Sequence, residues 1–354
     1  MKSSTRTFTD APAVRGRTPL LIGITGCSSS GKTYSALRLG AGLQRVVGGD
    51  VWVIDTEAGR AKQYAPKADG VAEPGTFVFR HVPLVAPFGP LDYLAAFEHC
   101  IEHGAKIIVV DQMTHEHSGI GGVLDQMDEY LDKKCGDDYG KRERHKMLAH
   151  AVPKAQRKML NARIVQLGIN AIFCYRAQDK IKPAEEGSSD RKPQKLGWQP
   201  ETTSPLFWDM TVRFLLLPGS DGKPTLHPQL EAEKLSTKLP EFLRPLIQPG
   251  VQLTEDLGEK LARWAAGEVA PTAPARSDGV PLVTLLASIA ECADVDRWRA
   301  EYGGAVKRLA AEGKAMVAEA GKRRREELRR NDAPPDDEPP PGALSGDRQE
   351  YVPQ

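Results

Sequence analysis

Short apolar runs alternate with longer amphipathic segments from Pro19 onward. Segments whose apolar residues recur at helical spacing separate runs of strand length, and this alternation predicts β-α-β units, that is, a mainly parallel sheet flanked by helices. The expected strands cover residues 20–25, 51–55, 107–111, 169–175 and 210–217. The expected helices cover residues 32–46, 91–103, 153–167 and 254–266. Pro153 suits a first helical turn, and Thr254 suits an N-cap.

The composition changes at both ends of this pattern. Residues 1–18 are polar without periodicity and predict a flexible leader, which leaves 19–267 as the main domain. Residues 268–280 are rich in Pro and Ala and predict a linker. Residues 281–330 show helical spacing and end in the basic run KRRREELRR, which predicts a small helical appendage, and the Pro-rich acidic residues 331–354 cannot form a core.

Charge and cysteine usage restrict the classes of function and the compartment. The 354 residues carry a formal net charge of +1, so any contact with nucleic acid must come from local basic segments. The five cysteines show neither CxxC nor zinc-finger spacing, which is typical of free thiols in a reducing cytosol. No apolar run reaches the roughly 20 residues of a membrane span, and residues 1–17 lack the apolar stretch of a signal peptide. We therefore expect a cytoplasmic protein without a membrane partner.

The segment GCSSSGKT, residues 26–33, matches the phosphate-binding motif G-x-x-x-x-G-K-[ST] and stands between an expected strand and an expected helix. Its glycines let backbone N–H groups point at phosphate oxygens, Lys32 would meet the β- and γ-phosphates, and Thr33 would ligate Mg²⁺. The alternative is a glycine-rich turn without a ligand. The expected nucleotide contacts are Gly26, Cys27, Ser28, Ser29, Ser30, Gly31, Lys32, Thr33 and Tyr34.

Two acidic residues complete the expected site for ATP and Mg²⁺. Asp111 ends the apolar run KIIVVD and is the candidate second magnesium ligand, although an Asp at a strand end can also begin a turn. Glu57 follows the strand 51–55 at the carboxyl edge of the sheet, where it could polarise an attacking water. The alternative for Glu57 is a solvated loop carboxylate.

Taken together, the segments GITGCSSSGKT, VWVIDTEAG, IIVVDQMTHEHSGIGGVLD and AIFCYRAQDKIK resemble the RecA-like ATPases of bacteriophages, known as AAA-family or single-strand-annealing recombination proteins. The resemblance covers about residues 20–267 and implies a RecA-like ATPase domain with Glu57 as the residue that activates water. It also places Arg176 where this family commonly has a Gln that senses the γ-phosphate. An arginine there could stabilise transition-state charge, clamp a phosphate or simply lie on the surface. We therefore count Lys32, Glu57, Asp111 and Arg176 as the expected catalytic residues.

The same resemblance implies DNA-binding loops after the strands that carry Asp111 and Arg176, at residues 112–122 and 177–196. The second segment is basic and could follow phosphates, although a charge run is usually a solvated face. Its basic residues are Lys180, Lys182, Arg191, Lys192 and Lys195. A further basic stretch at 141–158 has few aromatic residues for base stacking. His115 and His117 have no third ligand nearby, so they do not by themselves predict a metal centre.

The expected function is therefore ATP hydrolysis coupled to single-stranded DNA binding or annealing in phage recombination or replication. The expected partners are single-stranded DNA and either further copies of the chain or a recombination or replication protein. Two alternatives remain open. The opening IGITGCSSSGKT also resembles uridine-kinase-like enzymes, although the chain lacks an arginine-rich lid motif. A helicase loader whose appendage binds a partner protein is the other.

Overall fold

The computed structural model describes residues 10, 16, 18–68, 73–182, 194–268, 282–307, 309 and 311–332. The chain divides into two compact units, Met1–Ala275 and Arg276–Gln354. This division falls inside the segment 268–280 that the sequence predicts as a linker. Most of that linker, most of the leader 1–18 and the tail beyond Asp332 lie outside the described residues.

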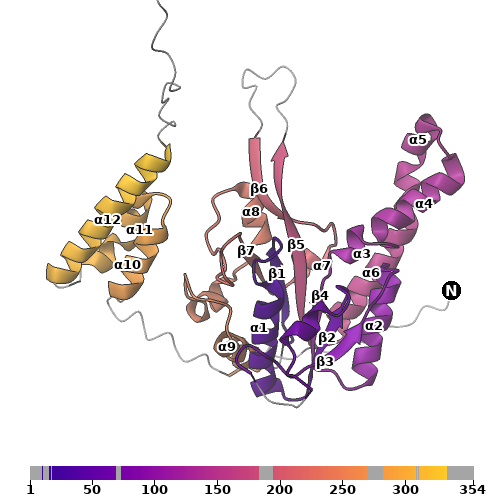
Figure 1. Ribbon diagram of the computed structural model, residues 1–354, viewed down its shortest axis with the longest axis horizontal. Coiled ribbons are helices and arrows are strands. Elements are labelled where there is room, and N and C mark those ends of the chain that lie inside the picture. Colours follow the sequence, from indigo (N-terminus) through magenta and orange to yellow (C-terminus); the bar gives the residue numbers. More distant parts are fainter. Residues whose placement is uncertain are drawn as a thin grey trace, which may run out of the picture. The chain divides into compact units, whose positions relative to one another are not determined.

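The first unit is built on a seven-stranded sheet with the order β3-β2-β4-β5-β1-β7, in which β6 pairs with β5 (Figure 1). Among the named strands of the described residues, β6 and β5 form the one antiparallel pair. The strands are β1 (Leu21–Gly26), β2 (Val51–Asp55), β3 (Arg80–Pro83), β4 (Ile107–Asp111), β5 (Asn170–Lys182), β6 (Gln194–Pro200) and β7 (Val212–Leu216). The predicted fold class, a mainly parallel sheet flanked by helices, is confirmed. Because β5 lies between β1 and β4, the phosphate loop that follows β1 must reach past the end of β5 to meet Asp111.

Helices cover both faces of this sheet. Helices α1 (Lys32–Val47) and α9 (Glu255–Ala265) pack on one face, and α2 (Pro90–Glu102) and α6 (Ala151–Gln166) pack on the other. Successive strand residues point to opposite faces, so Val53 joins the first core and Ile54 the second. Both faces are therefore buried, which explains the continuous apolar runs in the sequence.

Two glycines allow α1 and α9 to approach closely. A Cβ at Gly42 would lie 2.0 Å from the carbonyl oxygen of Glu255, and a Cβ at Gly258 would lie 2.3 Å from that of Leu39. Both distances are shorter than any real contact, so larger residues would push the helices apart. This packing fixes the helix that begins in the phosphate loop.

The remaining elements of the first unit are short or lie at its margins. Helices α4 and α5 extend away from the sheet (Figure 1) and bury a small cluster of their own that includes Met127 and Leu131. Their bounds, with those of the other short helices, are η1 (Arg60–Tyr64), α3 (His115–Ser118), α4 (Val123–Cys135), α5 (Tyr139–Ala149), α7 (Leu206–Asp209), α8 (Glu231–Ser236) and η2 (Glu241–Leu246).

The segment expected as a basic loop at 177–196 is instead part of a β-hairpin. Strand β5 continues to Lys182 and pairs with β6, with Gln178 opposite Gln199 and Lys180 opposite Gly197. In Figure 1 the two strands extend beyond the rest of the sheet. The expectation of a loop was wrong because residues 178–181 are exposed, so the hairpin carries no apolar alternation to read.

The second unit contains helices α10 (Leu282–Glu291), α11 (Val295–Lys307) and α12 (Ala311–Asp332). Leu285, Ile289, Trp298 and Val317 form its buried core. Helix α12 includes Asn331 and Asp332, so the structure corrects the start expected for the tail by two residues. Among the helices of the described chain, none combines the length and apolar character that a membrane crossing requires.

Candidate nucleotide-binding site

The phosphate loop joins the end of β1 to the start of α1 and depends on two glycines. Gly31 has φ 86°, and a Cβ there would lie 3.3 Å from the backbone nitrogen of Gly222. A Cβ at Gly26 would lie 2.5 Å from the Ser30 hydroxyl. A side chain at either position would therefore strain or fill the turn. The N-terminus of α1 adds the positive end of its dipole to this cradle, which fits a phosphate.

Lys32 lies inside the curl of the loop. Its Nζ donates a hydrogen bond to the carbonyl oxygen of Cys27 at 2.6 Å, and its side chain is largely buried. Burial lowers the pKa of Lys32, while the nearby Cys174 and Asp111 oppose that shift. Ser30 also donates to the Cys27 carbonyl, at 2.9 Å, whereas Ser28 and Ser29 are exposed at the rim.

Thr33 and Asp111 meet across the loop and the sheet. The Thr33 hydroxyl donates to Oδ2 of Asp111 at 2.9 Å. Burial raises the pKa of Asp111 to about 6, and the Thr33 hydrogen bond opposes this while the nearby Glu57 carboxylate adds to it. A buried carboxylate of this kind is stabilised by a cation beside it.

The two oxygens fit Mg²⁺, which usually takes one or two protein ligands and completes its shell with water and phosphate. No group of three or more His, Cys, Asp or Glu residues that could hold a metal occurs in the described part of the chain. His115 and His117 are engaged elsewhere. His115 Nδ1 lies 2.8 Å from the Thr56 hydroxyl, and His117 Nδ1 lies 3.4 Å from Nη2 of Arg157.

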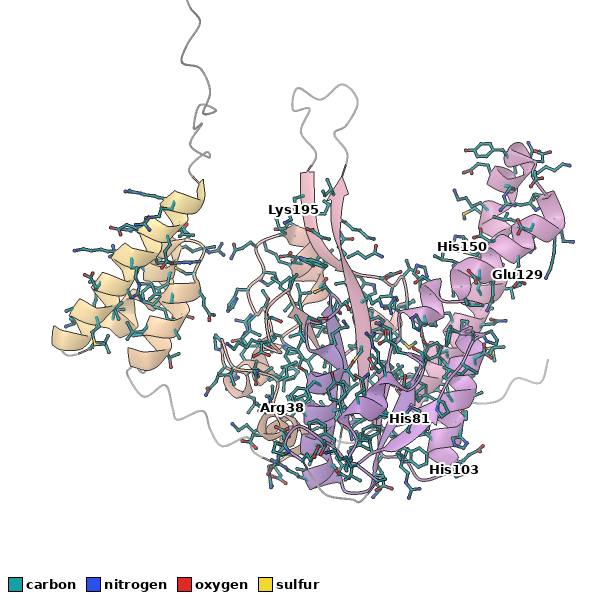
Figure 2. The ribbon with its side chains drawn as sticks, viewed as in Figure 1. Arg38, His81, His103, Glu129, His150 and Lys195 are labelled. Atoms are coloured by element: carbon teal, nitrogen blue, oxygen red, sulfur yellow. The ribbon has the colours of Figure 1, made fainter. Side chains whose placement is uncertain are left out.

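Asp55, which ends β2, holds the backbone that presents Glu57. Its Oδ1 accepts from the Glu57 backbone N–H at 2.7 Å, and its Oδ2 accepts from the Ala61 N–H at 3.1 Å. Nε2 of His81, on β3, lies 3.0 Å from the same Oδ2, and Figure 2 shows His81 within the strand region of the sheet. These contacts fix the turn between β2 and η1. The sequence did not indicate a role for Asp55, although its place at a strand end next to Glu57 was a signal.

The Glu57 carboxylate accepts hydrogen bonds from three side chains. Arg176 Nη2 donates to Oε1 at 2.7 Å, Gln112 Nε2 donates to Oε1 at 3.2 Å, and Arg60 Nη1 donates to Oε2 at 3.1 Å. Burial alone would raise the pKa of Glu57, but these donors outweigh burial and hold the pKa below its ordinary value. The structure therefore brings Glu57 and Arg176 together as an ion pair.

Gln112 offers an unused acceptor beside Glu57. Its side chain is buried, and its Oε1 has no hydrogen-bond partner among the residues that the structure describes. Because Nε2 points at Glu57, the amide oxygen is the free end. It could accept a hydrogen bond from a water that also donates to Glu57. Gln112 was not among the residues expected at the site, and its only signal in the sequence is that it follows Asp111.

An aromatic cluster lies beside the phosphate loop. The Tyr34 ring centroid lies 5.7 Å from that of Tyr64 and 5.5 Å from that of Phe77, and the Arg38 guanidinium lies 5.7 Å from the Tyr34 centroid. All three rings are partly exposed. Such a surface can stack a nucleobase without reading its hydrogen-bonding edge. Tyr34 was an expected contact, whereas Tyr64 and Phe77 are distant in sequence and were missed.

Of the five residues expected to bind DNA, the structure describes the side chains of two, Lys180 and Lys195. Lys180 is exposed on β5, and Lys195 on β6 lies 3.5 Å from Asp179; Figure 2 shows Lys195 on the hairpin. Lys182 ends β5, but its side chain lies outside the description, as do Arg191 and Lys192.

The segment 112–122, expected as a DNA-binding loop, contains helix α3 and is tied into the protein. Glu116 and Arg157 form a buried ion pair with two contacts of 2.7 Å, and Arg157 also donates to the Thr203 hydroxyl at 2.9 Å. Arg157 is therefore not part of an open basic surface.

The comparison with family models and the search of curated proteins both give no match for this chain.

Proposed function

We propose that the chain is a RecA-like ATPase that binds ATP with Mg²⁺ and hydrolyses it while acting on DNA. The observation that carries the nucleotide part is the 2.9 Å hydrogen bond between Thr33 and Asp111. It joins a phosphate loop to an acidic strand end, as a magnesium nucleotide site requires. The glycine cradle, the buried Lys32 and the nearby Glu57 support the same proposal.

In this proposal each side chain has a distinct task. Lys32 and the loop N–H groups bind phosphate oxygens, and Thr33 and Asp111 hold the metal, which supplies charge neutralisation when bound. Glu57 accepts a proton from water, and the Gln112 amide oxygen accepts a hydrogen bond from the second O–H of that water. Tyr34, Tyr64 and Phe77 stack the base. Stacking alone discriminates weakly among purines, so other purine triphosphates should also bind.

The DNA part rests on the resemblance to phage recombination ATPases and on the exposed Lys180 and Lys195 of the hairpin. We propose that the hairpin contacts single-stranded DNA during annealing in phage recombination or replication. Further copies of the chain or a recombination protein would be its partners, in the cytoplasm of the host. A phosphate backbone needs only such local cations, so the near-zero net charge is compatible with this role.

Two measurements test the proposal. Calorimetric titration with ATP should show binding that requires Mg²⁺ and is lost in Lys32→Ala, but is kept in Lys133→Ala, which removes an exposed lysine of α4. Circular dichroism would show that both variants fold. ATP hydrolysis should then rise when single-stranded DNA is added, and the rise should weaken as salt increases. Lys32-independent binding would overturn the nucleotide site, and phosphoryl transfer to a nucleoside instead of water would assign a kinase.

A further inference from the structure

The ion pair between Glu57 and Arg176 holds the expected general base against a cation. A general base needs a basic carboxylate, whereas each oxygen of Glu57 accepts a hydrogen bond from a cation, Arg176 on Oε1 and Arg60 on Oε2, and such donors make a carboxylate less basic. The Glu57 side chain is 12% exposed, whereas that of Arg176 is 46% exposed. The Glu57 carboxylate is thus mostly enclosed, whereas nearly half of the Arg176 side chain is open to solvent.

Sheet register places Arg176 beside the phosphate loop. In the pairing of β1 with β5, the Cα of Arg176 lies opposite that of Gly26, the first residue of the loop. Its backbone N–H donates a 2.8 Å hydrogen bond to the Thr114 hydroxyl, which holds the backbone of Arg176 at this edge of the sheet. An anion bound in the loop would attract this guanidinium, because a phosphate oxygen and a carboxylate offer it the same kind of acceptor.

We propose that Arg176 is a latch on Glu57 that the terminal phosphate of a bound nucleoside triphosphate opens. This inference rests on the proposed nucleotide-binding function. With a nucleoside diphosphate or no nucleotide, Arg176 stays on Glu57 and keeps the carboxylate weakly basic. A triphosphate draws Arg176 toward the loop, so Oε1 of Glu57 keeps only the neutral Gln112 donor and can accept a proton from water. Arg176 is thus a positioning residue for Glu57 as well as a phosphate ligand.

The latch makes a prediction about binding alone, without hydrolysis. Opening the Glu57–Arg176 pair opposes the binding of a triphosphate but not of a diphosphate. The measured quantity is the Kd of ADP divided by the Kd of the non-hydrolysable β,γ-imido analogue of ATP, both with Mg²⁺. In Glu57→Gln the neutral amide holds Arg176 weakly, so this ratio should rise by about 5- to 30-fold, within the usual range for coupled sites. In an Arg176→Ala background, Glu57→Gln should change the ratio less than about two-fold.

The double-mutant comparison separates the latch from simple charge repulsion. If the Glu57 carboxylate merely repelled the terminal phosphate, Glu57→Gln would raise the ratio equally in both backgrounds, and the latch would be overturned. An unchanged ratio in Glu57→Gln alone would also overturn it. The control is the exposed Asp50–Arg80 pair, for which Asp50→Asn and Arg80→Ala should leave the ratio at the parent value in every combination.

The same titrations distinguish failure of the latch from failure of the proposed function. If the parent protein binds neither nucleotide, the assignment of the nucleotide site is wrong and so is the latch. The same follows if the Lys32→Ala variant binds both nucleotides as tightly as the parent protein does. If binding depends on Lys32 but the cycle shows no coupling, only the latch is wrong. A matching spectroscopic result would be a change in Arg176 side-chain resonances with the triphosphate analogue but not with ADP.

Discussion

Glu57 is the residue on which the proposed chemistry depends most directly. Its position follows from Asp55, whose carboxylate fixes the turn after β2, and its basicity is held down by Arg176, Arg60 and Gln112. A carboxylate with a lowered pKa accepts protons poorly, so the surrounding donors decide when this side chain can act.

Glu57→Gln should therefore slow ATP hydrolysis by about 10²- to 10⁴-fold, the usual range for losing a general base, while nucleotide binding persists. Single-turnover hydrolysis at saturating ATP and Mg²⁺ measures the effect. Glu129→Gln, which changes an exposed carboxylate of α4, should keep the parent rate. If Glu57→Gln hydrolyses ATP at the parent rate, another group positions the water.

The predictability of the site from sequence differs from residue to residue. Lys32, Thr33 and Asp111 could be placed because the motif has fixed spacing and parallel strands end at one edge of the sheet. Gln112 and Tyr64 could not, because their contacts depend on where the chain returns in space. Arg176 was placed by resemblance, but its pairing with Glu57 depends on β5 lying between β1 and β4, which local patterns do not specify.

At the scale of elements, α6 shows how a charge pattern can mislead. Its basic residues suggested a surface for DNA, yet Arg157 points inward to Glu116 on α3, and this pair joins α6 to the segment after β4. A single charge left buried without its partner is strongly unfavourable.

Arg157→Ala should therefore lower the free energy of unfolding by about 3–5 kcal/mol, because Glu116 would remain buried and unpaired. Lys158→Ala, at an exposed position of the same helix, should change it by less than about 0.5 kcal/mol. Urea denaturation followed by far-ultraviolet circular dichroism compares them. If Arg157→Ala had the stability of the parent protein but bound DNA more weakly, Arg157 would have to be a DNA contact and not a stabilising residue.

Buried elements could be predicted from the sequence more readily than exposed ones. The expected strands at 51–55 and 107–111 coincide with β2 and β4 because both are fully buried and therefore continuously apolar. The outer part of β5 and β6 mix polar and charged residues with a few apolar ones such as Leu196 and Trp198, and among the strands of the described residues these two segments pair with each other. Their strand character comes from backbone hydrogen bonds, which leave little pattern in the sequence.

The hairpin is the element proposed to contact DNA. Replacing Lys180 and Lys195 with Ala should weaken single-stranded DNA binding and flatten the slope of log affinity against log salt by about 1.4 units, at about 0.7 for each phosphate contact. Fluorescence anisotropy of a labelled oligonucleotide across salt concentrations measures this slope. ATP affinity should be unchanged. Lys234→Ala, an exposed lysine on α8, is the control, and a double variant with the parent slope would contradict the DNA-binding role of the hairpin.

At the scale of the whole molecule, the two units bury separate cores. The first contains the sheet with its covering helices, and every residue of the proposed nucleotide site belongs to it. The second buries Leu285, Trp298 and Val317 within its own helices, and Trp298 donates a 2.9 Å hydrogen bond to Ser288 inside that unit. A unit with its own core can fold and act independently of its neighbour.

A chain ending at Ala275 should therefore bind ATP and Mg²⁺ with the affinity of the full-length protein, because no group of the site is removed. Calorimetric titration of both proteins gives the affinities, and thermal unfolding of the short chain should keep the transition that nucleotide shifts upward. A chain ending at Asp332, which removes only the acidic tail, is the matched control. Loss of ATP binding in a folded protein ending at Ala275 would mean that the second unit contributes to the site, and that the boundary at Ala275 does not separate independent parts of the molecule.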